Sequence, residues 1–429
     1  MSRVLPLALV MLAFLSTEVM AQWESVGQFP EDDTLTATMH GVAVDGDGKV
    51  WLSPWSATEE LEVSEDSVLT TRAIYVYNPD GSEVDFSPIQ IITIDGEPDT
   101  LLSPSNGLEK DMDGNILHAT GAGWIYRIDS QTGEGIDKFQ PQATSATKPA
   151  VDDAGNIYTG NVLSQTGPLR IYDNEWNFIE NAVDTTLGFS RAFAVTGDGN
   201  TIYWGGFTNE AIWKYTRPDE FSPFNAIPDT LFRGMTAEAF TRHPVSGNIW
   251  MSAGPSGQGS AYNEFSDYTW YEVDPETDMI VDSLVWDTTA GIDLEKPRGI
   301  AFSPDGMTAY AVMFDATSGA PSVQTFQYQD PVAIEKEPGD LPRSFALEQN
   351  YPNPFNPSTE IGFDLNEAGH VSLKVFDVLG REVAVLVDEH LTNGAYRFTF
   401  DAAHLTSGTY VYVLSANGER QSASMVLAK

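Results

Sequence analysis

The chain has 429 residues, no cysteine, and 62 acidic against 22 basic side chains, which gives a formal net charge of −40 at pH 7. Such a charge repels nucleic acid and anionic membrane surfaces, so neither is expected as a partner. Without cysteine the fold has no disulfide, and its stability depends on the burial of apolar side chains, for which a chain of this length is sufficient.

The first 21 residues have the pattern of a secretory signal peptide. Arg3 is the basic start, Val4 to Leu15 form a short apolar stretch, and Val19-Met20-Ala21 fits the small-x-small cleavage site. No other segment approaches the ~18 apolar residues that a membrane-spanning helix needs. We therefore expect residues 1–21 to be removed, and the mature chain to pass into the periplasm without a transmembrane segment.

Residues 22–329 contain a repeat. Six times, an apolar stretch is followed by a tight turn with glycine and then by a second apolar stretch. Such a turn requires positive φ, so each copy predicts a β-hairpin. The turn glycines are Gly48, Gly114, Gly155, Gly199, Gly247 and Gly306.

A second hairpin follows most copies, and Ile74 to Val84 is the clearest. Two hairpins make a four-stranded sheet, so the pattern predicts an all-β fold with a six-bladed β-propeller. The first copy resembles a blade of the NHL type, and this resemblance weakens along the chain. Trp23 to Phe29 precedes the first inner strand, so we expect it to pair as the outer strand of the last blade and to close the ring.

The long connections of the predicted propeller share one face. They include Ser53 to Arg72, Asp95 to Ser105, and Ser252 to Asp267. Long loops on a rigid scaffold usually carry binding, so we expect the ligand on this face. The candidate binding aromatics in or beside these loops are Trp55, Tyr262, Phe265, Tyr268 and Trp270; the alternative is that they belong to the local core.

The residues just before the inner strands should ring the mouth of the central channel. In the register of the repeats they are His40, Asn106, Thr147, Arg191, Thr236 and Arg298, and Glu238 faces the same way as Thr236. Arg191 and Arg298 predict a small basic throat for an anionic group. The alternative, which the sequence favours, is that both arginines pair with acidic neighbours of other blades.

Two function classes remain open. The favoured class is a non-catalytic module that binds a glycan or an anionic small molecule on the long-loop face. The other is a metal-dependent hydrolase or lyase that resembles gluconolactonase, a propeller type that holds a divalent cation with a Glu, Asn and Asp set. Asn106 and Glu238 could be two oxygen ligands for a cation such as Ca²⁺, but no Asp occurs in the ring register. The Asp-x-Asp-Gly turns at Asp45 and Asp111 are better explained as hairpin turns than as calcium loops.

Residues 330–343 are predicted to be a linker, since three prolines lie among charged residues. In residues 344–429, runs such as Ile361, Phe363 and Leu365 alternate with polar neighbours and are separated by turn residues. This pattern predicts a small immunoglobulin-like β-sandwich. The proline-rich opening lacks donors for a central strand and should form an extended lead-in.

Several motifs of this last segment occur in a fixed order. They are Tyr351, Pro352, Asn353 and Pro354, then Gly380, Gly408 and the terminal Lys429. From Phe345 to Lys429 the chain closely resembles the type A C-terminal sorting domain of the type IX secretion system. The resemblance implies that the type IX machinery is a partner, and that the chain is secreted or displayed on the outer-membrane surface.

Overall fold

The computed structural model divides into two compact units, residues 1–329 and 330–429. Both are built from strands and turns, and the described residues contain no helix. In the first unit the structure describes residues 23–31, 38–56, 58–64, 66–141, 143–162, 167–206, 211–253, 265–266, 268–287, 296–314 and 322–329. In the second it describes residues 346–347, 350, 352–353, 355–365, 369–377, 381–391, 394–402, 405–416 and 419–429. The predicted signal peptide, residues 1–21, and the predicted linker, residues 330–343, lie outside these residues.

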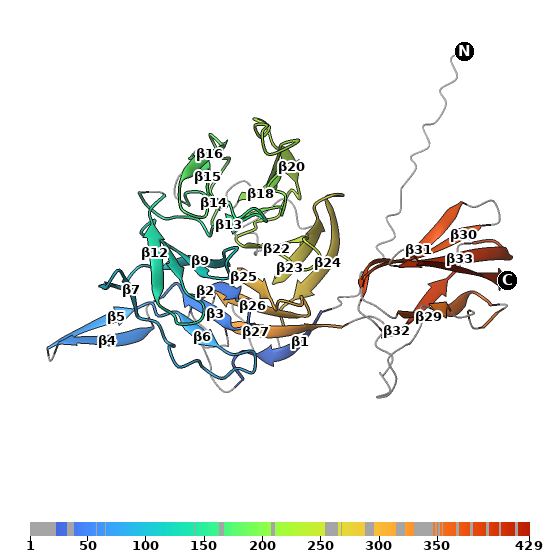
Figure 1. Ribbon diagram of the computed structural model, residues 1–429, viewed down its shortest axis with the longest axis horizontal. Helices are drawn as coiled ribbons and strands as arrows, with labels where there is room; N and C mark the ends of the chain where they lie inside the picture. Colours follow the sequence, from blue (N-terminus) through green and yellow to red (C-terminus); the bar gives the residue numbers. More distant parts are fainter. Residues whose placement is uncertain are drawn as a thin grey trace, which may run out of the picture. The chain divides into compact units, whose positions relative to one another are not determined.

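Six antiparallel sheets of the first unit follow one another in the chain, and we number them in that order (Figure 1). Sheet 1 consists of β2 (Met39–Val44), β3 (Val50–Pro54) and β6 (Tyr75–Tyr77). Sheet 2 has β9 (Ser105–Lys110), β10 (Ile116–Thr120), β11 (Ile125–Ile128) and β12 (Gly135–Phe139). Sheet 3 has β13 (Ala150–Val151), β14 (Ile157–Thr159), β15 (Leu169–Tyr172) and β16 (Phe178–Val183).

The other three sheets have the same order of strands. Sheet 4 has β17 (Phe193–Val195), β18 (Thr201–Gly206), β19 (Ala211–Thr216) and β20 (Asp229–Leu231). Sheet 5 has β21 (Phe240–Arg242), β22 (Ile249–Ala253), β23 (Thr269–Asp274) and β24 (Met279–Val285). Sheet 6 has β25 (Lys296–Phe302), β26 (Thr308–Phe314), β27 (Val323–Tyr328) and, from the start of the chain, β1 (Trp23–Gln28).

The predicted glycine turns join the first two strands of each sheet. All six turn glycines have positive φ, between 69° at Gly199 and 86° at Gly114, as the turn chemistry requires. In sheets 1 to 3 an aspartate at the start of the turn holds it. Asp45 Oδ1, for example, accepts hydrogen bonds from the backbone N–H groups of Asp47 and Lys49. Asp111 and Asp152 do the same in the next two sheets, so these carboxylates stabilise turns, as the sequence indicated.

The apolar core of the first unit lies between consecutive sheets. One buried cluster joins sheets 1 and 2, and further clusters join 2 with 3, 3 with 4, 4 with 5, 5 with 6, and 6 with 1. The first strands follow the same order, since β2 contacts β9, the contacts continue through β13, β17, β21 and β25, and β25 contacts β2. Figure 1 shows the sheets following one another from blue to orange around these inner strands.

The N-terminal strand β1 completes sheet 6, as predicted. Trp23 pairs with Tyr328 and Gln28 with Gln324 on β27. Trp23 is buried against Trp250, Phe302 and Tyr328, with ring centroids 5.2 to 5.8 Å apart. Pairing with β1 removes the open edge that β27 would otherwise present.

Two connections that the sequence suggested were loops contain hairpins of their own. β4 (Glu59–Ser64) pairs with β5 (Ser67–Thr71), and this hairpin projects from the unit in Figure 1. β7 (Ile91–Ile94) pairs with β8 (Glu97–Thr100) before sheet 2. Sheet 1 has three strands rather than the predicted four, and in the described residues the isolated bridges from Ile74 to Ile89 and from Tyr77 to Glu83 mark the fourth position.

The second unit has two antiparallel sheets with a common core. β28 (Ala346–Leu347), β29 (Ser358–Leu365) and β32 (Gly394–Asp401) form one sheet. β30 (Gly369–Asp377), β31 (Glu382–Leu391), β33 (Gly408–Ala416) and β34 (Glu419–Leu427) form the other. Ile361, Phe363 and Leu365 from the first sheet share a buried cluster with Leu373 and Tyr412 from the second, which explains the alternation in the sequence.

Candidate functional site

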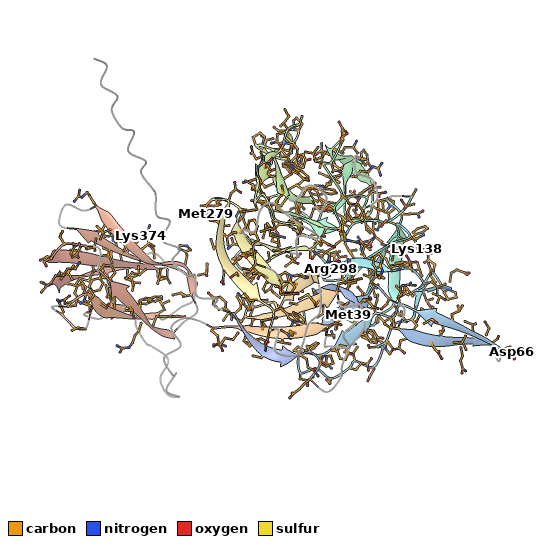
Figure 2. The ribbon with its side chains drawn as sticks, turned by 180° about the vertical axis from the view of Figure 1, so that it is seen from behind. Met39, Asp66, Lys138, Met279, Arg298 and Lys374 are labelled. Carbon is orange, nitrogen blue, oxygen red and sulfur yellow. The ribbon has the colours of Figure 1, made fainter. Side chains whose placement is uncertain are left out.

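The two arginines predicted at the channel mouth converge on one acidic side chain. Arg191 Nε lies 3.0 Å and Arg298 Nη2 lies 2.9 Å from the same oxygen, Oε2 of Glu238. Arg298 belongs to β25, while Arg191 and Glu238 precede the first strands of sheets 4 and 5, so the ion pairs connect three sheets. Figure 2 labels Arg298 on β25 and Met39 on β2, two strands that contact one another. These contacts correspond to the alternative in which the arginines pair across sheets.

Aromatic rings surround the two guanidinium groups. The carbon Cζ of Arg191 lies 5.4 Å from the ring centroid of Trp55 and 5.5 Å from that of Phe189. Arg298 Cζ lies 4.9 Å from the ring of Phe314. Flat rings hold guanidinium planes through cation–π attraction and restrict their orientation. Trp55 therefore joins the predicted mouth residues, while Phe189 and Phe314 are additions that strand register alone does not reveal.

Two other predicted mouth residues, His40 and Asn106, carry buried polar atoms that have no hydrogen-bond partner in the described part of the chain. Both ring nitrogens of His40 and Oδ1 of Asn106 are in this state. His40 is 5 % exposed and its ring lies 5.7 Å from that of Trp55. The amide nitrogen of Asn106 donates to Ser145 Oγ and to the carbonyl of Ala146, which fixes the side chain. Buried polar atoms without partners are uncommon and call for an explanation. We name His40, Trp55, Asn106, Arg191, Glu238 and Arg298 the mouth cluster.

The position of these residues relative to the strands differs in detail from the prediction. His40, Asn106 and Arg298 lie within β2, β9 and β25 rather than before them. Thr147 and Thr236, which the register placed beside them, are buried and precede the first strands of sheets 3 and 5. The first strands of sheets 3 to 5 are shorter than their repeats suggested, so their mouth residues fall in the preceding segments.

Burial determines the charge state of the mouth cluster. Burial, together with the positive charges of Arg298 and Arg191, lowers the pKa of His40 well below its ordinary value. His40 is therefore neutral near pH 7, with one nitrogen as donor and one as acceptor. Burial also lowers the pKa of Arg298 to about 10, against the opposing effect of Glu238. Near pH 7 the cluster has two cationic groups and one anionic group.

The predicted metal ligands do not assemble into a cation site in the described residues. Glu238 Oε2 already faces two guanidinium groups, which compete with any cation for that oxygen. Asn106 supplies one unpartnered oxygen, and no group of three or more histidine, aspartate or glutamate side chains suited to a metal occurs in the described part of the chain.

The other aromatics predicted on the loop face have mixed positions. Trp270 is fully buried on β23, where its indole nitrogen donates to the carbonyl of Arg298 at 2.8 Å. Trp270 is a core residue, because β23 is an inner strand of sheet 5 and the side chain packs in the cluster between sheets 5 and 6. Phe265 packs against Phe232 and Tyr271, and Tyr268 lies against the core between sheets 5 and 6. Tyr262 lies outside the described residues.

The motif residues of the second unit hold its N-terminal lead against the last strand. Phe355 forms a parallel bridge with Leu427, and Asn353 Oδ1 accepts the backbone N–H of Val426 at 2.9 Å. Gly408 begins β33, and the Lys429 backbone N–H donates to Ser407 Oγ. Asn353 and Phe355 of the proline-rich lead thus contact the last strand. Pro352 is exposed, and Tyr351, Pro354 and Gly380 lie outside the described residues.

Comparison with known proteins identifies this second unit. Residues 349–428 match the family described as the secretion system C-terminal sorting domain. This confirms the resemblance seen in the sequence, and such a domain implies export to the cell surface or secretion. A comparison with curated proteins finds no match. No helix in the described part of the chain is long and apolar enough to cross a membrane.

Solved structures give a weaker likeness. One is PorZ, an essential surface component of the type IX secretion system of Porphyromonas gingivalis, at 14% identity and a TM-score of 0.46, covering 91% of this chain and 51% of that one. The present chain thus spans about half of the PorZ structure. A luciferin-regenerating enzyme has 9% identity and a TM-score of 0.46, covering 71% of this chain and 94% of that one. Virginiamycin B lyase from Staphylococcus aureus has 13% identity and a TM-score of 0.42, with coverage of 71% and 98%.

Proposed function

Because residues 349–428 are a secretion system C-terminal sorting domain, we propose that this exported chain is a six-bladed β-propeller that binds an anionic ligand at its channel mouth. In this proposal residues 1–21 are a signal peptide, 22–329 the propeller, 330–343 a linker, and 344–429 an immunoglobulin-like sorting domain. The propeller acts as a non-catalytic binding module on the cell surface or in the medium.

The six-bladed arrangement is supported by the order of contacts between sheets. Each apolar cluster lies between two consecutive sheets, and the last cluster joins sheet 6 to sheet 1. The first strands follow the same order and return from β25 to β2. A set of sheets that each pack on two neighbours, with the first on the last, is the packing of a propeller. The NHL-type resemblance of the first repeat is consistent with this arrangement.

The observation that carries the binding proposal is the set of unused hydrogen-bonding atoms in the mouth cluster. Arg298 Nε, both nitrogens of His40 and Oδ1 of Asn106 are buried without a hydrogen-bond partner in the described residues. Two arginines share one glutamate, so the cluster keeps a net positive charge within a strongly acidic chain. An anionic group would receive charge-assisted hydrogen bonds, and neighbouring hydroxyl groups would suit His40 and Asn106. A carboxylated sugar combines both features.

Calorimetric titration of the mature chain tests this proposal, with sodium glucuronate as probe and glucose as its uncharged counterpart. We expect glucuronate to bind and glucose to bind at least about 10-fold more weakly, since the charged hydrogen bonds are lost. Arg191→Ala should weaken glucuronate binding by a similar factor. Lys214→Ala is the control, because it removes the 2.7 Å ion pair with Asp278 outside the mouth, and it should leave glucuronate binding unchanged. Equal binding of both sugars, or of wild type and Arg191→Ala, would contradict an anion site at the mouth.

A further inference from the structure

A second feature of the first unit is a cavity of about 600 Å³, lined by residues from the first strands of all six sheets. These strands start at the long connections and end at the glycine turns. The cavity lies at the turn end, because it is lined by residues that follow the first strands, such as Asp111, Asp152 and His243. We name it the turn-end cavity. Its volume is within the range of roughly 300 to 1,000 Å³ that small-molecule sites have.

The two most deeply buried acidic side chains of this cavity have their oxygens occupied. Asp152 accepts from the backbone N–H groups of Ala154 and Asn156, from the Asn156 amide, and from the Tyr158 hydroxyl. Asp111 accepts from the backbone N–H groups of residues 113 and 115 and from the side-chain amide of residue 115. Its second oxygen also lies 3.0 Å from Nε of Arg127. Neither carboxylate is left to bind a cation.

The remaining acidic groups are also engaged. Glu109 Oε1 accepts the backbone N–H of Lys110, and Glu109 Oε2 pairs with Lys148 Nζ. Asp153 Oδ1 pairs with Arg242 Nη1 at 2.6 Å. The acceptors among the charged groups of the cavity are therefore largely satisfied by the protein itself.

The cationic groups, in contrast, retain unused donors. Lys148 Nζ donates to Glu109 and to the carbonyl of Phe240 at 3.0 Å, which leaves one of its three protons. Arg242 bonds Asp153 and the carbonyl of Val151, and a guanidinium has five N–H groups. Within the described residues the Lys110 ammonium makes no hydrogen bond or ion pair. A cavity whose hydrogen-bond donors are partly unused and whose acceptors are satisfied favours a ligand that accepts hydrogen bonds.

Apolar side chains supply the rest of the surroundings. Leu108, Phe193 and Phe302 lie on strands that line the cavity, while their side chains pack in the clusters between sheets. Met112 and Val245 line the cavity from turns of sheets 2 and 5. Met112 is 55% and Val245 58% exposed, which is a high exposure for apolar side chains at tight turns. Methionine adapts its shape readily and is common at surfaces that bind varied apolar groups.

We propose that the turn-end cavity is a second binding site, which takes a small organic carboxylate with an apolar body. Lys110 receives the carboxylate, and the remaining protons of Lys148 and Arg242 complete its hydrogen bonds. The apolar body lies against Met112 and Val245. This site contains no residue of the mouth cluster, so its test is independent of the test of the function proposed above.

Nuclear magnetic resonance of the mature chain with ¹³C-methyl methionine tests the location, with sodium octanoate as probe. We expect octanoate to shift the methyl resonance of Met112 with saturation. Met279, which is 62% exposed on β24 and lies at the outer part of its unit in Figure 2, is the internal control and should not shift. Octan-1-ol, which lacks the charge, should require at least about 10-fold higher concentration for the same shift. Equal shifts at both methionines, or none at Met112, would overturn the proposal.

Substitution tests the role of the lysine. Lys110→Ala should weaken octanoate binding about 10-fold, and Lys110→Arg should restore most of it, because the cation is retained. Lys138→Ala is the matched control, since Lys138 lies on β12 at the periphery seen in Figure 2 and pairs with Asp99 of β8. The affinity of this variant for octanoate should equal that of wild type. Unchanged affinity in Lys110→Ala, with Met112 still shifting, would show that the carboxylate is bound elsewhere and overturn the assignment.

Discussion

Arg298 and Glu238 form an ion pair of 2.9 Å whose side chains are only 5% and 2% exposed, so sheets 5 and 6 are joined by charges withdrawn from water. Arg191, with its side chain 24% exposed, approaches the same glutamate oxygen from sheet 4. This arrangement makes Glu238 a link between sheets as well as the counter-charge of the proposed anion site. The two arginines are thus part of the packing of the fold.

Replacement of Glu238 should therefore destabilise the first unit. In Glu238→Gln two guanidinium groups lose their shared counter-charge, and breaking a buried pair typically costs about 3 to 5 kcal/mol. Arg191→Ala should cost less, because its side chain is partly solvated and Arg298 still pairs with Glu238. Thermal unfolding of wild type, Glu238→Gln and Arg191→Ala measures the order of their stabilities. A Glu238→Gln protein as stable as wild type would show that the ion pairs contribute no net stability.

Loss of Trp23 should open sheet 6. Trp23 is 6% exposed and touches three aromatic rings, so Trp23→Ala should lower the free energy of unfolding by about 3 to 5 kcal/mol. Val26→Ala on the same strand is the control, since Val26 is 58% exposed and its truncation should cost less than about 0.5 kcal/mol. Urea unfolding monitored by tryptophan fluorescence compares them. Similar losses from both substitutions would indicate that β1 contributes through its backbone alone.

Stability should fall as the pH drops from 6.5 to 4. Burial lowers the pKa of His118 from 6.5 to about 4 in the folded state, and neither ring nitrogen has a partner in the described residues. In this window the unfolded chain binds a proton that the folded chain does not, so acid favours unfolding, by roughly 3 kcal/mol at the lower end. His118→Leu should remove this contribution. Parallel stability curves for wild type and variant across this pH window would refute the assignment.

Removal of the sorting domain should leave the first unit folded but retained in the periplasm. The chain divides into two compact units at residues 329 and 330, and each has its own apolar core. A chain ending at residue 344, expressed in a bacterium with a type IX secretion system, should unfold thermally like the first unit of the full chain. Cell fractionation measures its location. Normal amounts of the shortened chain outside the cell would contradict the role of residues 349–428 in export.

Local patterns were sufficient for much of this architecture. Glycine turns such as Gly48 and Gly114 require positive φ wherever they occur, so the hairpins could be placed from the sequence. Alternation at Ile361, Phe363 and Leu365 likewise predicted which side chains meet in the second unit. The sorting domain was recognisable because its motifs occur in order over a short segment.

Contacts between distant segments were decided only by the tertiary structure. The register placed Arg191, Glu238 and Arg298 on one ring but did not show that a single oxygen of Glu238 serves both arginines. The sequence left open whether Trp270 binds a ligand or belongs to the local core, and the structure shows a core residue. The end of a strand cannot be located from propensity when its neighbour in space is unknown. The turn-end cavity depends on which donors of Lys110, Lys148 and Arg242 remain after pairing across sheets. Periodicity reports which face of a strand is apolar, whereas the partner of each charge depends on three-dimensional distance.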